Sequence, residues 1–243
     1  MKTVGIIQAR MTSTRLPGKV LKKVLGKSLI EYELERLQSV SLLDELIVAT
    51  TKNESDDPIV DLCEKLGVET YRGPEHDVLL RFYEAAKCFG ADIVIRFTAD
   101  CPLLDPGIVA DIIRTYLDNC NRLDYLGVDH TSIPRGMEAE AFSFEALERA
   151  NAEGAGDLDR EHVTWFMHQN PDRFSISKYA LPQKLGTYRF TVDTEEDFSL
   201  VSKILEELYE NNPYFSLQDT IALLDQKPEI RMINAGIQQK KYI

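Results

Sequence analysis

The chain of 243 residues is acidic, with 40 Asp and Glu against 28 Lys and Arg and a formal net charge of -12 at pH 7. This charge argues against general nucleic-acid binding, and no apolar run approaches the roughly 20 residues that span a bilayer. The four cysteines fit neither a zinc site nor a disulfide framework. Hydrophobic residues make up 44% of the chain, enough for the core of one α/β domain over residues 1–243. The sequence opens on a strand pattern instead of a signal peptide, so we expect a cytoplasmic protein.

The first half of the chain alternates between strand patterns and helix patterns. Short apolar runs predict strands at 4–7, 45–50, 68–71 and 92–97. Helical spacing and capping residues predict helices at 29–38, 57–67 and 77–90 and another that starts at Asp105-Pro106. This alternation predicts a mainly parallel sheet covered on both faces, a Rossmann-like three-layer α/β/α domain. Ligands of such sheets bind beyond the carboxyl ends of the strands.

The pattern becomes less regular after Asp124. We expect strands at 139–142, 174–179 and 188–192, and helices after Ser143, at 159–168, after Thr194 and at 217–224. Thr194 with Asp197 three positions later has the outline of a capping box. The polar tail from Asn234 either packs onto the body or stays mobile.

A cationic segment follows the first strand. Residues 1–30 contain no Asp or Glu, and Arg10, Arg15 and Lys19 accompany three consecutive hydroxyl residues at 12–14. Pro17-Gly18 sets a turn directly before Lys19. Guanidinium forks and a lysine ammonium pair well with phosphate oxygens, so the segment predicts a phosphate-binding loop. The alternative is a solvated turn with surface lysines. The loop is not a Walker A motif, which has a glycine five positions before its second glycine and Ser or Thr after the lysine.

Two distant aspartates follow strand patterns. Asp100 ends the strand at 92–97, and Asp193 lies between the strand at 188–192 and the next helix. Carboxylates at the ends of neighbouring strands could hold Mg²⁺, which takes oxygen ligands from one or two carboxylates, waters and phosphates. Each aspartate could instead cap a turn or a helix, which is a common function of Asp.

Four segments resemble a known family. They are Ile7-Gln8-Ala9-Arg10 with Ser13, Arg15-Leu16-Pro17 and Lys19; Thr98-Ala99-Asp100-Cys101-Pro102-Leu103; Asp159-Arg160-Glu161-His162-Val163-Thr164; and Thr191-Val192-Asp193-Thr194-Glu195-Glu196-Asp197. Together they resemble the acylneuraminate and KDO cytidylyltransferases, and most closely their spore-coat-polysaccharide-type members. The resemblance implies a nucleotide-diphospho-sugar transferase-like fold and a homodimer, with the dimerisation arm and acceptor-sugar elements within about 124–190.

The resemblance also implies roles for individual residues. The catalytic residues would be Arg10, Lys19 and Asp100, and Asp100 and Asp193 would hold Mg²⁺. The nucleotide would bind to Ala9, Arg10, Ser13, Arg15, Lys19, Asp77, Arg81 and Thr98. The acceptor sugar would bind to Arg135, Glu138, Arg160, Glu161 and His162. Each of the less specific positions has a plainer interpretation, such as a helix cap for Asp77 and a packing residue for His162.

The expected activity is a Mg²⁺-dependent transfer of a cytidylyl group from CTP to a sugar or sugar acid, with release of pyrophosphate, for surface polysaccharide synthesis. Thr98 stands where KDO enzymes have Gln, which argues against KDO itself as the sugar. One alternative is a glycosyltransferase that uses a nucleotide sugar, but the close Asp-x-Asp pair of such enzymes is absent around Asp100. Another alternative is a nucleotide-binding partner without catalytic activity.

Overall fold

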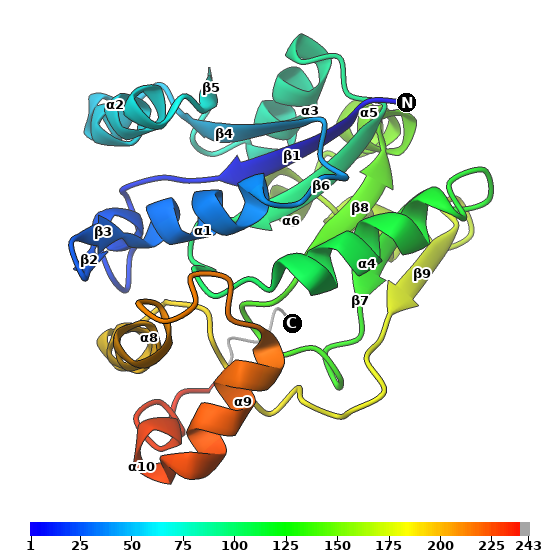
Figure 1. Cartoon of the computed structure of the whole chain (residues 1–243). Helices are drawn as coiled ribbons and strands as arrows, with labels where there is room; N and C mark the ends of the chain where they lie inside the picture. Colours follow the sequence, from blue (N-terminus) through cyan, green and yellow to red (C-terminus); the bar gives the residue numbers. More distant parts are fainter. Residues whose placement is uncertain (239–243) are drawn as a thin grey trace.

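The computed structural model describes residues 1–238 (Figure 1). In this part of the chain a seven-stranded sheet has the order β5–β4–β1–β6–β8–β7–β9. The strands are β1 Thr3–Gln8, β4 Glu45–Thr51, β5 Glu69–Gly73, β6 Ile93–Thr98, β7 Tyr125–Val128, β8 Glu140–Ser143 and β9 Ile176–Tyr179. The first four of the order are parallel, β8 runs antiparallel to both of its neighbours, and β9 is parallel to β7. The sheet is therefore mainly parallel, as the alternation predicted.

Helices cover both faces of the sheet (Figure 1). One core cluster joins α1 (Leu29–Gln38), α2 (Asp57–Leu66) and α4 (Pro106–Leu117) to one face, and another joins α3 (Val78–Cys88) and α5 (Phe144–Glu153) to the other. Ile6 and Ile7 of β1 point to opposite clusters and are both fully buried. This is why β1 has a continuous apolar run instead of alternation. The fold is the three-layer α/β/α arrangement that the sequence predicts.

Smaller elements complete the described chain. The hairpin of β2 (Lys23–Val24) and β3 (Lys27–Ser28) follows the short 3-10 helix η1 (Lys19–Leu21), and η2 (Glu54–Asp56) precedes α2. After β8 come α6 (Asp157–Glu161), α7 (Trp165–Gln169), α8 (Glu195–Leu208), α9 (Leu217–Gln226) and α10 (Pro228–Arg231). The last three helices gather beside the edge of the sheet where β1 and β6 end (Figure 1). The predicted tail is described only to residue 238, and its remainder lies outside the described residues.

The prediction of one continuous helix at 159–168 is wrong, because the chain is helical at both ends of this range but leaves the helical path after Glu161. His162 is extended, with φ -113° and ψ 91°, and α7 begins only at Trp165. Between the two helices, Val163 is fully buried and the Thr164 hydroxyl donates to Glu140 at 2.9 Å. Both side chains of the break lie in the interior, and the helical spacing of the apolar residues does not reveal the break.

The predicted strand at 188–192 is also wrong, and β7 is an element that the sequence did not predict. The segment 188–192 makes a single bridge, between Arg189 and Arg135. The Val192 amide then donates to the Asp100 carbonyl at 2.8 Å, so successive backbone groups bond to two different loops. Phe190 and Val192 are both fully buried, which explains the alternation without a strand. By contrast, all four residues of β7 are buried and give no alternating signal.

The order of the strands defines a switch point beside β1. The chain passes from β1 to β4 and β5 on one side and then returns to place β6 on the other. Crevices for ligands form at the carboxyl ends of the strands on either side of such a point. The cationic segment follows β1 and Asp100 follows β6, so both start from this crevice.

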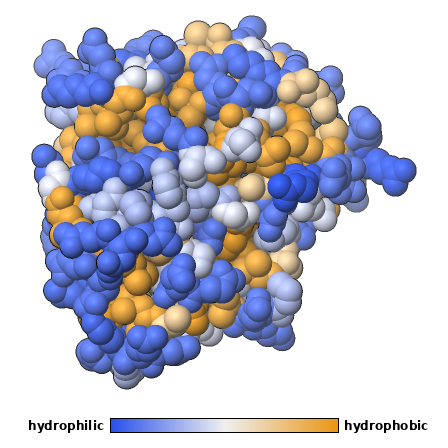
Figure 2. Space-filling view, viewed as in Figure 1, coloured by the Kyte–Doolittle hydropathy of each residue, from blue (hydrophilic) through white to orange (hydrophobic). Residues whose placement is uncertain are grey.

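The surface seen in Figure 2 is mixed. Hydrophobic areas are separated by hydrophilic ones, which is ordinary for a folded protein. None of the helices in residues 1–238 is long and apolar enough to cross a membrane.

Candidate active site

A cavity of about 590 Å³ opens at the switch point. It is lined by residues from both halves of the chain, including most of the residues proposed from the sequence. Those are Ala9, Arg10, Ser13, Arg15, Lys19, Arg81, Thr98, Asp100, Arg135, Glu138, Glu161, His162 and Asp193. The structure thus brings the nucleotide, metal and acceptor candidates to one cavity.

Asp77 and Arg160 do not line this cavity and are paired with each other. The Arg160 guanidinium donates to the Asp77 carboxylate through Nε at 2.9 Å and Nη2 at 2.7 Å. Asp77 also accepts the Leu80 amide at 2.9 Å as the N-cap of α3. This pair joins α6 to α3, and the helix-cap interpretation of Asp77 describes the observed contacts.

The cationic loop is closed on itself and anchored to the body. Gly18 has a φ of 69°, a left-handed conformation that favours glycine, and its amide donates to the Met11 carbonyl at 2.9 Å. The Met11 amide in turn donates to the fully buried Asp56 carboxylate at 2.7 Å. The turn ends at η1, whose first residue is Lys19. The predicted Pro17-Gly18 turn therefore directs Lys19 into the cavity.

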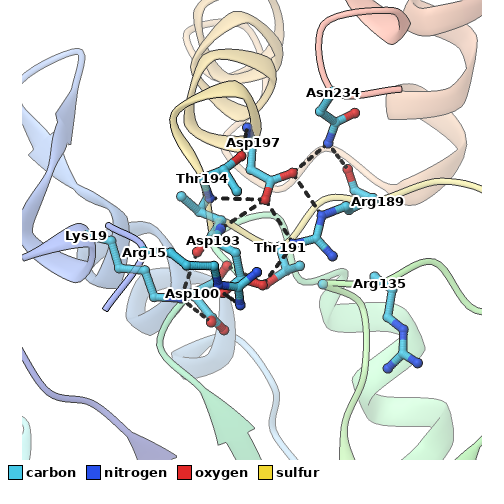
Figure 3. Close-up of polar contacts among 12 residues, drawn as sticks. Arg15, Lys19, Asp100, Arg135, Arg189, Thr191, Asp193, Thr194, Asp197 and Asn234 are labelled. Carbon is cyan, nitrogen blue, oxygen red and sulfur yellow. Dashed lines mark hydrogen bonds and ion pairs between the residues drawn. The ribbon is translucent and has the colours of Figure 1, made fainter. Parts of the chain in front are cut away.

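Lys19 joins the loop to both proposed metal carboxylates (Figure 3). Its Nζ donates to Asp100 Oδ2 at 2.6 Å, to Asp193 Oδ1 at 2.9 Å and to the Val192 carbonyl at 2.8 Å. Lys19 is only 9% exposed. Arg15 adds a second cation, with Nη2 3.0 Å from Asp193 Oδ1. Residues separated by more than 170 positions therefore meet at one ammonium group.

The electrostatics of this cluster favour its charged form. Burial alone would lower the pKa of Lys19, but the attraction of Asp100 and Asp193 outweighs it and raises the pKa above 10.5. Burial would raise the pKa of Asp193, but Lys19, Arg189 and Arg15 lower it below 3.8. At neutral pH the cluster therefore holds the Lys19 ammonium beside an ionised Asp193 carboxylate.

Sequence reasoning missed Glu33, a fully buried acid behind Asp100. It accepts the Cys101 amide at 3.3 Å through Oε2, while Oε1 has no partner within the described residues. Burial, with a smaller contribution from Asp100, raises the pKa of Glu33 well above 4.5. The sequence signal was available, since Glu33 interrupts the apolar face of α1 between Tyr32 and Leu34.

We expect Glu33→Gln to stabilise the protein more as the pH rises. Above pH 4.5 the unfolded state loses the Glu33 proton, whereas the folded state keeps it. The free energy of unfolding of the parent therefore falls as the pH rises above 4.5. Glutamine has no proton to lose and keeps the shape of the acid. The free energy of unfolding in urea, measured at about pH 5 and about pH 8, gives the check. If the free energy of unfolding of the variant differed from that of the parent by the same amount at both pH values, Glu33 would not be a neutral acid in the folded protein.

A partly buried ion pair that was not singled out from the sequence also lines the cavity. Arg96 of β6 pairs with Glu140 of β8 and also donates to the Gln8 side chain at 3.1 Å. Glu140 accepts from the Tyr125 hydroxyl at 2.5 Å and from the Thr164 hydroxyl at 2.9 Å. An arginine in the middle of a predicted central strand was the signal for such a pair.

The remaining wall carries Arg135 and Glu138. Arg135 Nη1 lies 3.3 Å from Glu138 Oε1, and Glu138 Oε2 accepts the Gly136 amide at 2.5 Å. His130 lies beside them, and burial together with the charge of Arg135 lowers its pKa to about 4. His130 is therefore a neutral imidazole at neutral pH, and Arg135 is a fixed cation beside it.

Solved structures share the fold of this chain. A cytidylyltransferase from Leptospira borgpetersenii serovar Hardjo-bovis is 31% identical, with a TM-score of 0.91 over 100% of both chains. Another solved structure is that of a CMP:2-keto-3-deoxy-manno-octonic acid synthetase complexed with CTP. It has a TM-score of 0.65 and 17% identity, and the match covers 85% of this chain and 99% of the synthetase chain. At this identity the likeness shows the fold alone. The fold, together with 31% identity to a cytidylyltransferase over the whole chain, defines a nucleotidyltransferase.

Sequence comparison makes the assignment narrower. The cytidylyltransferase family model matches residues 4–225, and the chain belongs to that family. The uncharacterised protein MJ1063 of Methanocaldococcus jannaschii is 38% identical over 244 residues, covering 100% of this chain and 98% of the relative. The spore coat polysaccharide biosynthesis protein SpsF of Bacillus subtilis is 31% identical over 234 residues, which cover 92% of this chain and 94% of the relative.

Proposed function

We propose that this protein is a Mg²⁺-dependent cytidylyltransferase that joins CTP to a sugar or sugar acid for surface polysaccharide synthesis. The observation that carries the proposal is the meeting of Lys19, Asp100 and Asp193 beside the cationic loop. The name of the relative SpsF supports a polysaccharide pathway, and the CTP in the synthetase structure supports a cytidine nucleotide.

The residues present fit a magnesium ion. The oxygens of Asp100 and Asp193 converge on one ammonium, so the same pair could share a divalent cation in place of that ammonium. Within the described residues there is no group of three or more His, Cys, Asp and Glu side chains arranged to hold a metal. Mg²⁺ suits such a site, because it commonly binds to one or two carboxylates and completes its shell with waters and substrate phosphates. When bound, it would neutralise phosphate charge in the transition state.

The side chains of the loop would hold and orient the triphosphate. Arg10, Arg15 and Lys19 supply cations, and Ser13 lies on the same cavity wall. The acceptor hydroxyl would attack the α-phosphorus in line, and pyrophosphate would leave. Such transfers depend mainly on positioning and on charge stabilisation, both of which a closed, anchored loop provides.

Arg81 supports a preference for cytosine. It is 2% exposed, lines the cavity and has an Nε–H without a partner in the described part of the chain. Its Nη1 donates to the Pro74 carbonyl at 2.6 Å, which fixes the guanidinium in place. Cytosine presents acceptors at O2 and N3, whereas uracil has a donor at N3. A fixed guanidinium edge would therefore favour CTP over UTP.

We expect Arg81→Lys to reduce the preference for CTP over UTP by roughly tenfold, because lysine lacks the planar fork of donors. The ratio of kcat/KM for the two nucleotides gives the measurement. Arg114→Lys, which changes an exposed arginine on α4 that pairs with Asp111, is a matched control that should leave the ratio unchanged. An unaltered ratio in Arg81→Lys would remove Arg81 from base selection.

The acceptor would bind in the same cavity as the nucleotide. Arg135, Glu138, Glu161 and His162 line this cavity and offer both donors and acceptors to a hydroxyl-rich ligand. Arg160 would act only indirectly, since its guanidinium is paired with Asp77.

A nucleotide screen followed by a turnover assay tests the proposed function. Thermal stability is measured with CTP, UTP, ATP, GTP and dTTP in the presence of Mg²⁺, because a ligand of the native state raises the melting temperature. Pyrophosphate release from CTP with candidate sugars is then measured. Stabilisation by CTP with pyrophosphate release is the expected result. A preference for a purine would contradict cytidylyl transfer, consumption of a nucleotide sugar would indicate a glycosyltransferase, and binding without turnover a non-catalytic partner.

A further inference from the structure

A hydrogen-bonded network lies behind Asp193, on the side away from Lys19 (Figure 3). The two oxygens of the Asp193 carboxylate have different partners. Oδ1 accepts from Lys19 at 2.9 Å and from Arg15 at 3.0 Å, whereas Oδ2 accepts from Arg189 Nη2 at 2.8 Å. The guanidinium of Arg189 thus holds one oxygen and leaves the other toward the cavity cations.

Arg189 is itself held by Asp197, which is fully buried. The guanidinium contacts Asp197 Oδ1 through Nε and Oδ2 through Nη2, both at 2.9 Å. Asp197 Oδ2 also accepts the backbone amides of Asp193 at 3.0 Å and Thr194 at 3.2 Å. Asp197 therefore fixes both the backbone of Asp193 and the arginine that orients its side chain.

Asn234 completes the network from the C-terminal side of α10. It is 7% exposed, and its Nδ2 donates to Asp197 Oδ1 at 2.8 Å and to the Arg189 carbonyl at 3.1 Å. Asn234 lies beyond residue 225, where the match to the family model ends. The segment after α9 is therefore bonded directly to the residues that support the candidate metal carboxylate.

We propose that Arg189, Asp197 and Asn234 are positioning residues that present Asp193 Oδ1 to a divalent cation bound with the nucleotide triphosphate. The inference rests on the proposed function and extends it to the C-terminal segment. A carboxylate held at one oxygen and at its backbone loses little further freedom when it binds a cation. Removal of such supporting partners of metal ligands commonly lowers metal affinity 10–100-fold.

A purely structural role of this network would predict a different experimental result. The same contacts cap α8 and tie down the segment after α10, so their loss could lower the free energy of unfolding without affecting the cation. Metal affinity and stability therefore have to be measured separately on the same variants.

Two variants weaken the network gently. Asn234→Ala removes the hydrogen bonds to Asp197 and to the Arg189 carbonyl, and leaves the ion pair between Asp197 and Arg189. Arg189→Lys keeps the positive charge but cannot bridge Asp193 and Asp197 with a planar fork. Asn119→Ala is the matched control, because the Asn119 side chain also donates to a backbone carbonyl, that of Thr115, outside the cavity.

The experiment measures binding of Mn²⁺ to the full-length protein with CTP, by electron paramagnetic resonance, together with urea unfolding without metal. We expect Asn234→Ala and Arg189→Lys to weaken Mn²⁺ binding by about tenfold or more, and the Mg²⁺ concentration for half-maximal turnover to rise in parallel. CTP binding without metal and the Asn119→Ala control should match the parent. Mn²⁺ affinity equal to that of the parent in both variants would overturn the positioning role, whatever their stability. Absence of CTP-dependent Mn²⁺ binding in the parent would instead overturn the proposed function, and this inference with it.

Discussion

Replacing Lys19 by alanine is expected to lower cytidylyl transfer by about 100–1000-fold while the fold remains intact. A preorganised charge of this kind contributes roughly 3–4 kcal/mol to the stabilisation of a transition state. Lys19 is the one residue in Figure 3 that contacts both Asp100 and Asp193 from the cationic loop. Without its ammonium, the two carboxylates face each other uncompensated by the loop lysine, and the triphosphate loses a donor. The measurement is steady-state pyrophosphate release with CTP and the acceptor found in the screen.

The control for this variant is Lys22→Ala. Lys22 belongs to the same basic segment but pairs with the exposed Glu195 and does not line the cavity. An exposed pair contributes little, so turnover should stay near that of the parent. Near-normal turnover in Lys19→Ala, or an equal loss in both variants, would contradict a specific role for Lys19 and favour a general effect of positive charge.

Replacing Glu140 by glutamine is expected to destabilise the fold by about 1–3 kcal/mol, because it leaves the partly buried Arg96 guanidinium without its counter-ion. Burial would raise the pKa of Glu140, but Arg96 and the hydroxyls of Tyr125 and Thr164 lower it below 4.5, so the pair is ionised in the folded protein. The free energy of unfolding in urea is the measurement. Glu206→Gln, in the exposed pair with Lys203, should leave the free energy of unfolding close to that of the parent.

A double variant separates the pair from its parts. Arg96→Met combined with Glu140→Leu removes both charges, and we expect it to be less destabilised than the sum of the single changes. Simple additivity would mean that the two side chains do not act as a pair.

The sequence was sufficient to predict the first half of the fold, because its strands and helices have strong local signals. The apolar run around Ile6 marks a strand buried on both faces, and Asp105-Pro106 marks the start of α4, where Asp105 accepts the Gly107 amide at 2.8 Å. The second half was harder for a physical reason. The break at His162 and the extended segment around Phe190 are imposed by burial against distant elements, which no local pattern shows.

The positions of site residues were predictable where the type of residue and the order of the strands are enough to place the side chain. Lys19 and Asp100 follow adjacent strands β1 and β6, so a parallel sheet brings them to the same edge. Asp193 required the resemblance to a known family, since it reaches Asp100 through a non-strand segment bonded to that loop. Arg189 and Asn234 were not predicted, because their function would be to hold Asp193, and a supporting contact between residues 45 positions apart has no sequence signature.

The most direct measurement is a crystal structure of the protein with CTP and Mn²⁺, in which the anomalous signal locates the metal. We expect a manganese peak roughly 2.1 Å from carboxylate oxygens of both Asp100 and Asp193, with the triphosphate lying against Arg15 and Lys19. A manganese peak bound elsewhere, or a triphosphate bound away from the cationic loop, would contradict the account.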